Sequence, residues 1–141
     1  MRINTRIAQL LLAGVFSFAL TGTAFSQNTI TVKAPHGGQV KEAGGNYFIE
    51  TLFTKDKSFV FLLDASVNPV GNTGISGNVV FQLPDSSFVV SDFIPYLSDG
   101  FQLKGMVPAY TFYTVNFDFG GRRISAGFAG NASGNALSDQ Q

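Results

Sequence analysis

The hydrophobic pattern of the chain changes character near residue 27. Before this point lies one uncharged and mainly apolar run, Ile7 to Leu20. After it, short runs of β-branched and aromatic residues recur between clusters of Gly, Asn, Asp and Pro. None of these later runs sustains a helical period. The pattern predicts many short strands, and therefore an all-β domain.

Two pairs of neighbouring glycines predict hairpins with two-residue turns, Gly44–Gly45 and Gly120–Gly121. The second pair gives the stronger signal, because apolar and polar residues alternate regularly in the segment before it. The strands that flank the two pairs are expected at residues 39–43, 46–54, 110–119 and 122–128.

The strand expected at residues 46–54 has one apolar face and one polar face. Tyr47, Ile49 and Phe53 share the apolar face, and Glu50 falls on the other. This alternation is typical of a sheet that is wetted on one side, so we expect Glu50 to face water.

The segment Phe59–Leu63 is apolar at every position, unlike the alternating strands around it. A strand of this kind belongs in the middle of a sheet with both faces covered. The other strands are expected at residues 30–33, 78–83, 87–94 and 101–104. Eight or nine short strands at this spacing favour two packed layers. We therefore expect an antiparallel β-sandwich of immunoglobulin-like type.

The first 26 residues have the make-up of a cleaved secretory signal. Arg2 and Arg6 precede the apolar run, and the small residues Ala24 and Ser26 come before an expected cleavage at Gln27. The run is too short for a membrane span. The expected mature product is a soluble periplasmic or secreted protein without a membrane anchor. Residues 27–128 form its single domain, and residues 129–141, with almost no bulky apolar residue, form a disordered tail.

Charge and cysteine content narrow the classes of partner. Cleavage leaves seven of the nine Lys and Arg residues against nine Asp and Glu residues, so the mature domain is mildly acidic. The only adjacent bases are Arg122 and Arg123, and phosphate backbones need clustered positive charge. We therefore expect no nucleic acid and no membrane surface as partner. Cys is absent, so packing alone must stabilise the fold.

Reactive side chains are scarce in the mature chain. It has one histidine, His36, and no serine within a glycine-flanked nucleophile elbow. We therefore expect that the protein is not an enzyme and has no bound cofactor. A weak divalent metal is left open, with His36, Glu42 and Glu50 as its candidate ligands. The alternative is that the imidazole simply decorates a turn.

Two turn-rich segments are the expected contact surfaces. Residues 34–38 predict a tight corner, and residues 67–77 predict a loop of about ten residues, a length at which loops often carry function. The candidate contact residues in them are Pro35, Gly37, Gly38, Asn68, Pro69 and Asn72. Tyrosine rings are a further candidate surface for a sugar or a peptide, but we expect most aromatic rings to lie in the core.

Two segments, Ala34–Val40 (APHGGQV) and Gly44–Glu50 (GGNYFIE), resemble a small periplasmic module. The module opens with Pro-His-Gly-Gly and continues to a strand of Gly, aromatic, aliphatic and Glu residues. The likeness extends through residues 61–64, 68–70 and 77–79 to the last hairpin. Such modules occur alone and attached to periplasmic adaptor subunits of heavy-metal efflux pumps. This chain lacks the lipoyl-like and helical-hairpin segments of an adaptor, so the resemblance implies a stand-alone protein of the cell envelope.

Two functions follow as expectations. The first is an exported, non-enzymatic binding or accessory module, linked to metal handling or efflux, that contacts a protein or a small ligand in the cell envelope. The alternative is a structural or cell-surface interaction protein that associates through an exposed sheet edge.

Overall fold

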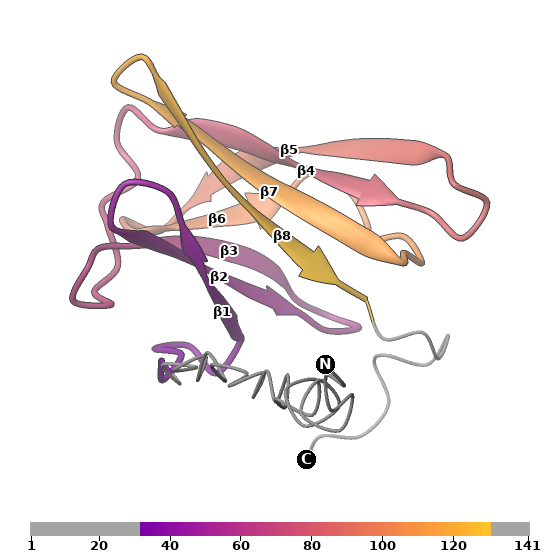
Figure 1. Cartoon of the computed structure of the whole chain (residues 1–141), viewed down its shortest axis with the longest axis horizontal. Helices are drawn as coiled ribbons and strands as arrows, with labels where there is room; N and C mark the ends of the chain where they lie inside the picture. Colours follow the sequence, from indigo (N-terminus) through magenta and orange to yellow (C-terminus); the bar gives the residue numbers. More distant parts are fainter. Residues whose placement is uncertain (1–31, 131–141) are drawn as a thin grey trace, which may run out of the picture. The chain divides into compact units, whose positions relative to one another are not determined.

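The computed structural model describes residues 32–130, and all regular structure in this part of the chain is β (Figure 1). The expected signal peptide and most of the expected tail lie outside the described residues. The strands are β1 (Gln39–Ala43), β2 (Tyr47–Phe53), β3 (Ser58–Leu63), β4 (Ser76–Gln82), β5 (Phe88–Tyr96), β6 (Gly100–Leu103), β7 (Phe112–Phe119) and β8 (Arg122–Ala129). The predicted class, all-β and antiparallel with eight strands in the described part, is confirmed.

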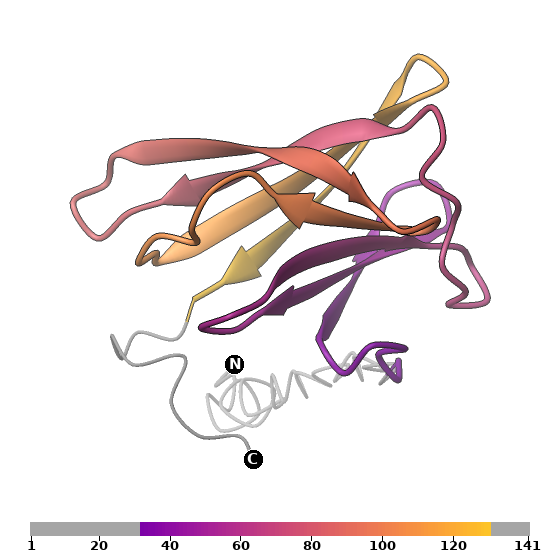
Figure 2. The ribbon, with the colours of Figure 1, turned by 180° about the vertical axis from the view of Figure 1, so that it is seen from behind.

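Strand pairing gives the order β1-β2-β3-β6-β5-β4-β7-β8, and every pair is antiparallel. Strand β5 belongs to two layers, since Phe88–Asp92 pairs with β4 and Phe93–Tyr96 pairs with β6. Layer A is β1, β2, β3, β6 and the second half of β5. Layer B is the first half of β5 with β4, β7 and β8 (Figure 2).

The strand order matches that of a seven-stranded immunoglobulin-like domain when β2 to β8 are taken as its strands A to G. Strand β1 is then an addition at the edge. The layers differ from a simple sandwich because β5 joins them into one nearly closed sheet. The two end strands meet, and the Lys41 ammonium on β1 donates to the Gly127 carbonyl on β8.

The core lies between the layers and is rich in aromatic rings. In layer A, alternate residues of β2 and β3 point inward, among them Ile49, Val60 and Leu62, which are fully buried. In layer B the same is true of Phe81 and Phe117. As expected, β3 lies inside its sheet between β2 and β6, and its last four residues are buried.

The two hairpin predictions had different outcomes. Gly120 and Gly121 form a two-residue turn with φ of 56° and 73°, as predicted. The turn at Gly44 is longer than predicted, because Ala43 pairs with Tyr47 and leaves three residues between the strands. Asn46 takes up the extra left-handed position with a φ of 65°, which asparagine tolerates better than most residues.

The expected first strand at residues 30–33 is not formed in its described part, since Val32 and Lys33 lie outside any strand. The loop expected at residues 67–77 ends earlier, because β4 already begins at Ser76. Among the described residues, no helix is long and apolar enough to cross a membrane.

Candidate functional site

The segment Pro35–Gly38, here named the corner, turns back over the outer face of layer A (Figure 1). The Gly37 N–H donates to the Ala34 carbonyl at 3.2 Å, and Gly37 has a φ of 79°, a conformation that favours glycine. Gly38 lies so close to β2 that a Cβ on it would be 2.2 Å from the Thr51 carbonyl oxygen. The corner therefore needs both glycines, one for its backbone angle and one for its close approach.

Glu50 on β2 holds the corner in place. Its Oε1 accepts the backbone N–H groups of His36 at 2.9 Å and Gly38 at 3.0 Å, and its Oε2 lies 2.8 Å from His36 Nδ1. Glu50 is fully buried, so the expectation that it faces water was wrong. A buried carboxylate is costly without partners, and here three donors from one turn supply them.

His36 is fixed by two contacts at once. Its ring stacks on Phe61 of β3, with centroids 3.6 Å apart and planes 8° from parallel. Glu50 engages Nδ1 of the ring and leaves Nε2 as the ring nitrogen that Glu50 does not contact. About 30% of the side chain is exposed. A carboxylate that orients an imidazole in this way is the usual arrangement behind metal-binding histidines.

The three expected metal ligands do not form one cluster. His36 and Glu50 are in contact, but both carboxylate oxygens of Glu50 are used inside the fold. Glu42 lies on β1, where its Cα pairs with Phe48 rather than with Glu50, and it is exposed. Within residues 32–130 no group of three or more His, Cys, Asp and Glu side chains is placed to hold a metal ion. Of the expected metal ligands, the corner can therefore offer a metal ion only Nε2 of His36.

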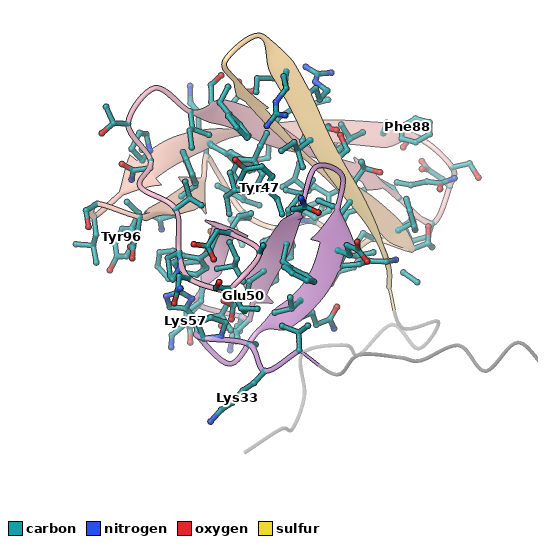
Figure 3. All side chains as sticks on the ribbon, turned by 60° about the vertical axis from the view of Figure 1, so that its left-hand side comes forward. Lys33, Tyr47, Glu50, Lys57, Phe88 and Tyr96 are labelled. Carbon is teal, nitrogen blue, oxygen red and sulfur yellow. The ribbon has the colours of Figure 1, made fainter. Side chains whose placement is uncertain are left out.

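Aromatic rings continue from the corner across layer A. Phe59 lies on the same face of β3 as Phe61. The centroid of its ring lies 4.6 Å from that of Tyr96 on β5. Gly100 on β6 makes room for this row, since a Cβ on it would be 2.8 Å from the Phe61 ring. Tyr96 is 39% exposed and labelled in Figure 3. The row therefore runs from the partly exposed His36 to the partly exposed Tyr96.

The other tyrosines belong to the core, as expected for most rings. Tyr47 and Tyr110 pack against the buried cluster. The Tyr113 hydroxyl lies 2.7 Å from Thr51 Oγ1, and burial raises the pKa of Tyr113 well above its usual value. None of these three rings presents a free surface like that of Tyr96.

The loop between β3 and β4 gives mixed outcomes for the expected contact residues. Asn68 is exposed and Pro69 half-buried, and the loop is ordered by Asp64, whose Oδ1 accepts the N–H groups of Ser66 and Asn68. Val67 in this loop has a φ of 64°, an unusual conformation for a β-branched residue.

Asn72, the third contact candidate in this loop, is buried and works inside the fold. Its side-chain amide donates to the carbonyls of Leu97 at 3.1 Å and Gly100 at 2.9 Å, and its backbone N–H donates to Ser98. It therefore holds the β5–β6 turn and has no free amide for a partner.

A shallow open hollow lies at the β7–β8 turn. It is lined by Asp118, Phe119, Gly121, Arg122 and Arg123. Arg123 makes a bidentate ion pair with Asp118 at 2.8 and 3.0 Å, which lowers the pKa of the Asp118 carboxyl. Arg122 lies over the Phe119 ring. Both guanidinium groups are thus engaged by this hairpin's own side chains.

The turn at the corner could be predicted from the sequence, but the Glu50 hydrogen bonds that hold it could not. The sequence pattern placed Glu50 on the outer face of β2, which is correct. What covers that face is fixed by a turn twelve residues away, and no local pattern reports it.

Comparisons with known proteins return nothing for this chain: no family model, no curated protein and no solved structure matches. The likeness to the Pro-His-Gly-Gly module therefore stays a prediction.

Proposed function

We propose that the chain is an exported, non-enzymatic binding module of the cell envelope, and that its contact group is the His36 imidazole. One observation carries the proposal: a fully buried carboxylate fixes Nδ1 of a partly exposed histidine at 2.8 Å. A histidine that only decorated a turn would not need a buried charge to orient it. The ring is instead held in one orientation, by the Glu50 hydrogen bond and by the stack on Phe61.

The proposed ligand is a borderline divalent cation such as Zn²⁺, which neutral imidazole nitrogens bind well. One protein donor gives only weak binding, so a second molecule must supply the remaining donors. This requirement suits an accessory protein that meets a metal already held by a partner. It also agrees with the resemblance to modules attached to heavy-metal efflux adaptors.

The alternative, association through a free sheet edge, has less support. The two end strands β1 and β8 lie against each other, and the Lys41 ammonium bridges them. The two edges are not paired through their backbones, but their closeness limits the room for a neighbouring strand at either one.

A zinc titration followed by NMR tests the proposal. At millimolar Zn²⁺ the ring resonances of His36 are expected to shift, with the larger effect at Nε2. In His36→Gln the shifts should be lost, whereas the matched control Glu42→Gln should leave them unchanged. A His36 ring that stays unshifted, or shifts that persist in His36→Gln, would contradict the proposal.

A second variant separates orientation from binding. Glu50→Gln keeps the side-chain volume but removes the charge that fixes Nδ1, so zinc binding should weaken severalfold while His36 remains in place. Circular dichroism of the variant checks that the strands are retained. Equal zinc affinity in the wild type and the variant would remove Glu50 from the proposed site.

A further inference from the structure

The outer face of layer B carries an apolar area that nothing in the described chain covers. Phe88, Val90 and Phe112 are 66%, 59% and 39% exposed, and Phe88 is labelled in Figure 3. Strand pairing places the residues of this area in two rows across β5, β4, β7 and β8. The rows are Phe88, Gln82, Phe112 and Ala129, and then Val90, Val80, Thr114 and Gly127; together they are here named the open patch.

The open patch extends over one face of four neighbouring strands. Phe112 lies across the neighbouring strand β8 instead of standing upright, because Gly127 leaves room for its ring: a Cβ on Gly127 would be 2.6 Å from Phe112 Cζ. Val80, Val90 and Thr114 are β-branched and Ala129 is short, whereas the longer side chains Phe88 and Gln82 lie together at one end of the open patch. An extended apolar sheet face is suited to a second extended surface and not to a small ligand, which needs a concave site.

Charged residues lie around the open patch and not within it. The open patch contains no Asp, Glu, Lys or Arg. In the next row the side chains of Asn78, Asn116 and Ser125 bond to one another at 2.9 and 2.7 Å, and the exposed Asp92 stands at its β5 end. The ion pair of Asp118 and Arg123 lies beyond that row.

The charges around the open patch narrow the choice of occupant. The exposed carboxylates of Asp85, in the β4–β5 turn, and Asp92, in the next row, flank it, and the exposed Lys104, whose backbone N–H donates to the Asp92 carbonyl, lies beside Asp92. The Lys41 ammonium at the seam between β1 and β8 is bonded to the Gly127 carbonyl. A membrane-binding face carries Lys or Arg around its apolar centre, so flanking carboxylates disfavour an anionic lipid surface.

We propose that the occupant is a second copy of this chain, packed face to face on the open patch. A two-fold axis brings the same patch of both copies together, and a patch without charge meets itself without like-charge repulsion. The flanking carboxylates then lie at the rim of the interface, where water solvates them. The proposal is independent of the function proposed for His36, which lies on the outer face of the other layer.

Sedimentation equilibrium of the exported wild-type protein over a wide concentration range tests this inference. A reversible monomer–dimer equilibrium is expected. In Val90→Lys an exposed side chain becomes charged and opposes its own copy, so the dissociation constant should rise by at least about tenfold. The matched control is Gln102→Lys, an exposed strand position on the outer face of layer A, which should dissociate like the wild type.

A second measurement locates the interface. In amide NMR spectra recorded at increasing concentration, signals of Val80, Val90 and Thr114 should shift, and those of His36 and Gly38 should not. A wild type that stays monomeric at millimolar concentration would overturn the proposal. So would equal weakening by both lysine variants, or binding to lipid vesicles by a protein that remains monomeric.

Discussion

The outer faces of the two layers carry similar residues but have different environments. Layer A has Phe59 and Phe61 on its outer face, and layer B has Val90 and Phe112. In layer A the corner covers Phe61, which is only 6% exposed, whereas Val90 in layer B is 59% exposed. The same kind of apolar strand face can thus be part of the fold or part of a surface, depending on one short turn.

The cover of layer A depends on polar contacts and not on apolar burial alone. Three hydrogen bonds from the corner end on one buried carboxylate, and the imidazole of His36 fills the space above Phe61. The open patch of layer B has no comparable buried charge behind it. The comparison therefore predicts that changes in the corner destabilise the protein and that equivalent changes in the open patch do not.

The largest effect is expected for Glu50→Ala. The variant removes the acceptor of three hydrogen bonds. The backbone N–H groups of His36 and Gly38 and the His36 ring then lose their partner. The free energy of unfolding should fall by about 2–4 kcal/mol, because hydrogen bonds to a charged group contribute about 1.5–3 kcal/mol each and the freed donors of this surface turn regain contact with water. Urea unfolding followed by fluorescence or circular dichroism measures it.

The control for Glu50→Ala is Gln102→Ala at an exposed strand position, which should change stability by less than about 0.5 kcal/mol. Equal, small losses for both variants would mean that the corner does not depend on Glu50.

Two glycine substitutions, one on each outer face, are expected to differ in their effect on stability. In Gly100→Ala the new Cβ meets the Phe61 ring at 2.8 Å, and that ring is held between β6 and His36. The expected loss of stability is about 1–3 kcal/mol, the typical cost of overpacking. In Gly127→Ala the Cβ meets the Phe112 ring at 2.6 Å, but Phe112 is exposed and can swing away, so the loss should be below about 0.5 kcal/mol.

Thermal and urea unfolding of both alanine variants provides the check. A larger loss for Gly127→Ala than for Gly100→Ala would reverse the assignment of covered and open faces.

The strands could be predicted because their signals are local. Alternation in β7 and the glycine pair after it define the last hairpin, and the uninterrupted apolar run of β3 marks a central strand. The remaining differences come from long-range contacts. Alternation places Glu50 on the outer face but does not report that the corner covers it, because the covering turn is distant in sequence.

Only part of the candidate site could be predicted from the sequence, because the rest also depends on long-range contacts. The composition of the β3–β4 loop predicts turns, but whether Asn72 faces a partner or the β5–β6 turn depends on strand order. His36 and Glu50 could be named as candidates from their residue types. Their direct hydrogen bond required knowing that the corner folds onto β2.

The smallest effect concerns the exposed ion pair of layer B. The Arg123 guanidinium donates to Asp118 and lowers the pKa of that carboxyl below its ordinary value of 3.8. A lowered folded-state pKa means that the pair stabilises the protein above the unfolded-state pKa, and that this contribution is lost as the pH falls through the folded-state pKa.

NMR titration of the Asp118 carboxyl measures this effect. In Arg123→Gln the pKa of Asp118 should rise back toward 3.8, while stability at neutral pH hardly changes, because solvent screens exposed pairs. An unchanged Asp118 pKa in this variant would show that the pair is not formed.

Amide hydrogen exchange of His36 and Gly38 tests most directly whether a buried carboxylate holds the corner. Both residues lie in a surface turn, where exchange is usually fast, but both donate to Glu50 Oε1. Both amides should exchange slowly in the wild type and much faster in Glu50→Ala, with the amides of β7 still protected. Fast exchange of His36 and Gly38 in the wild type would contradict it.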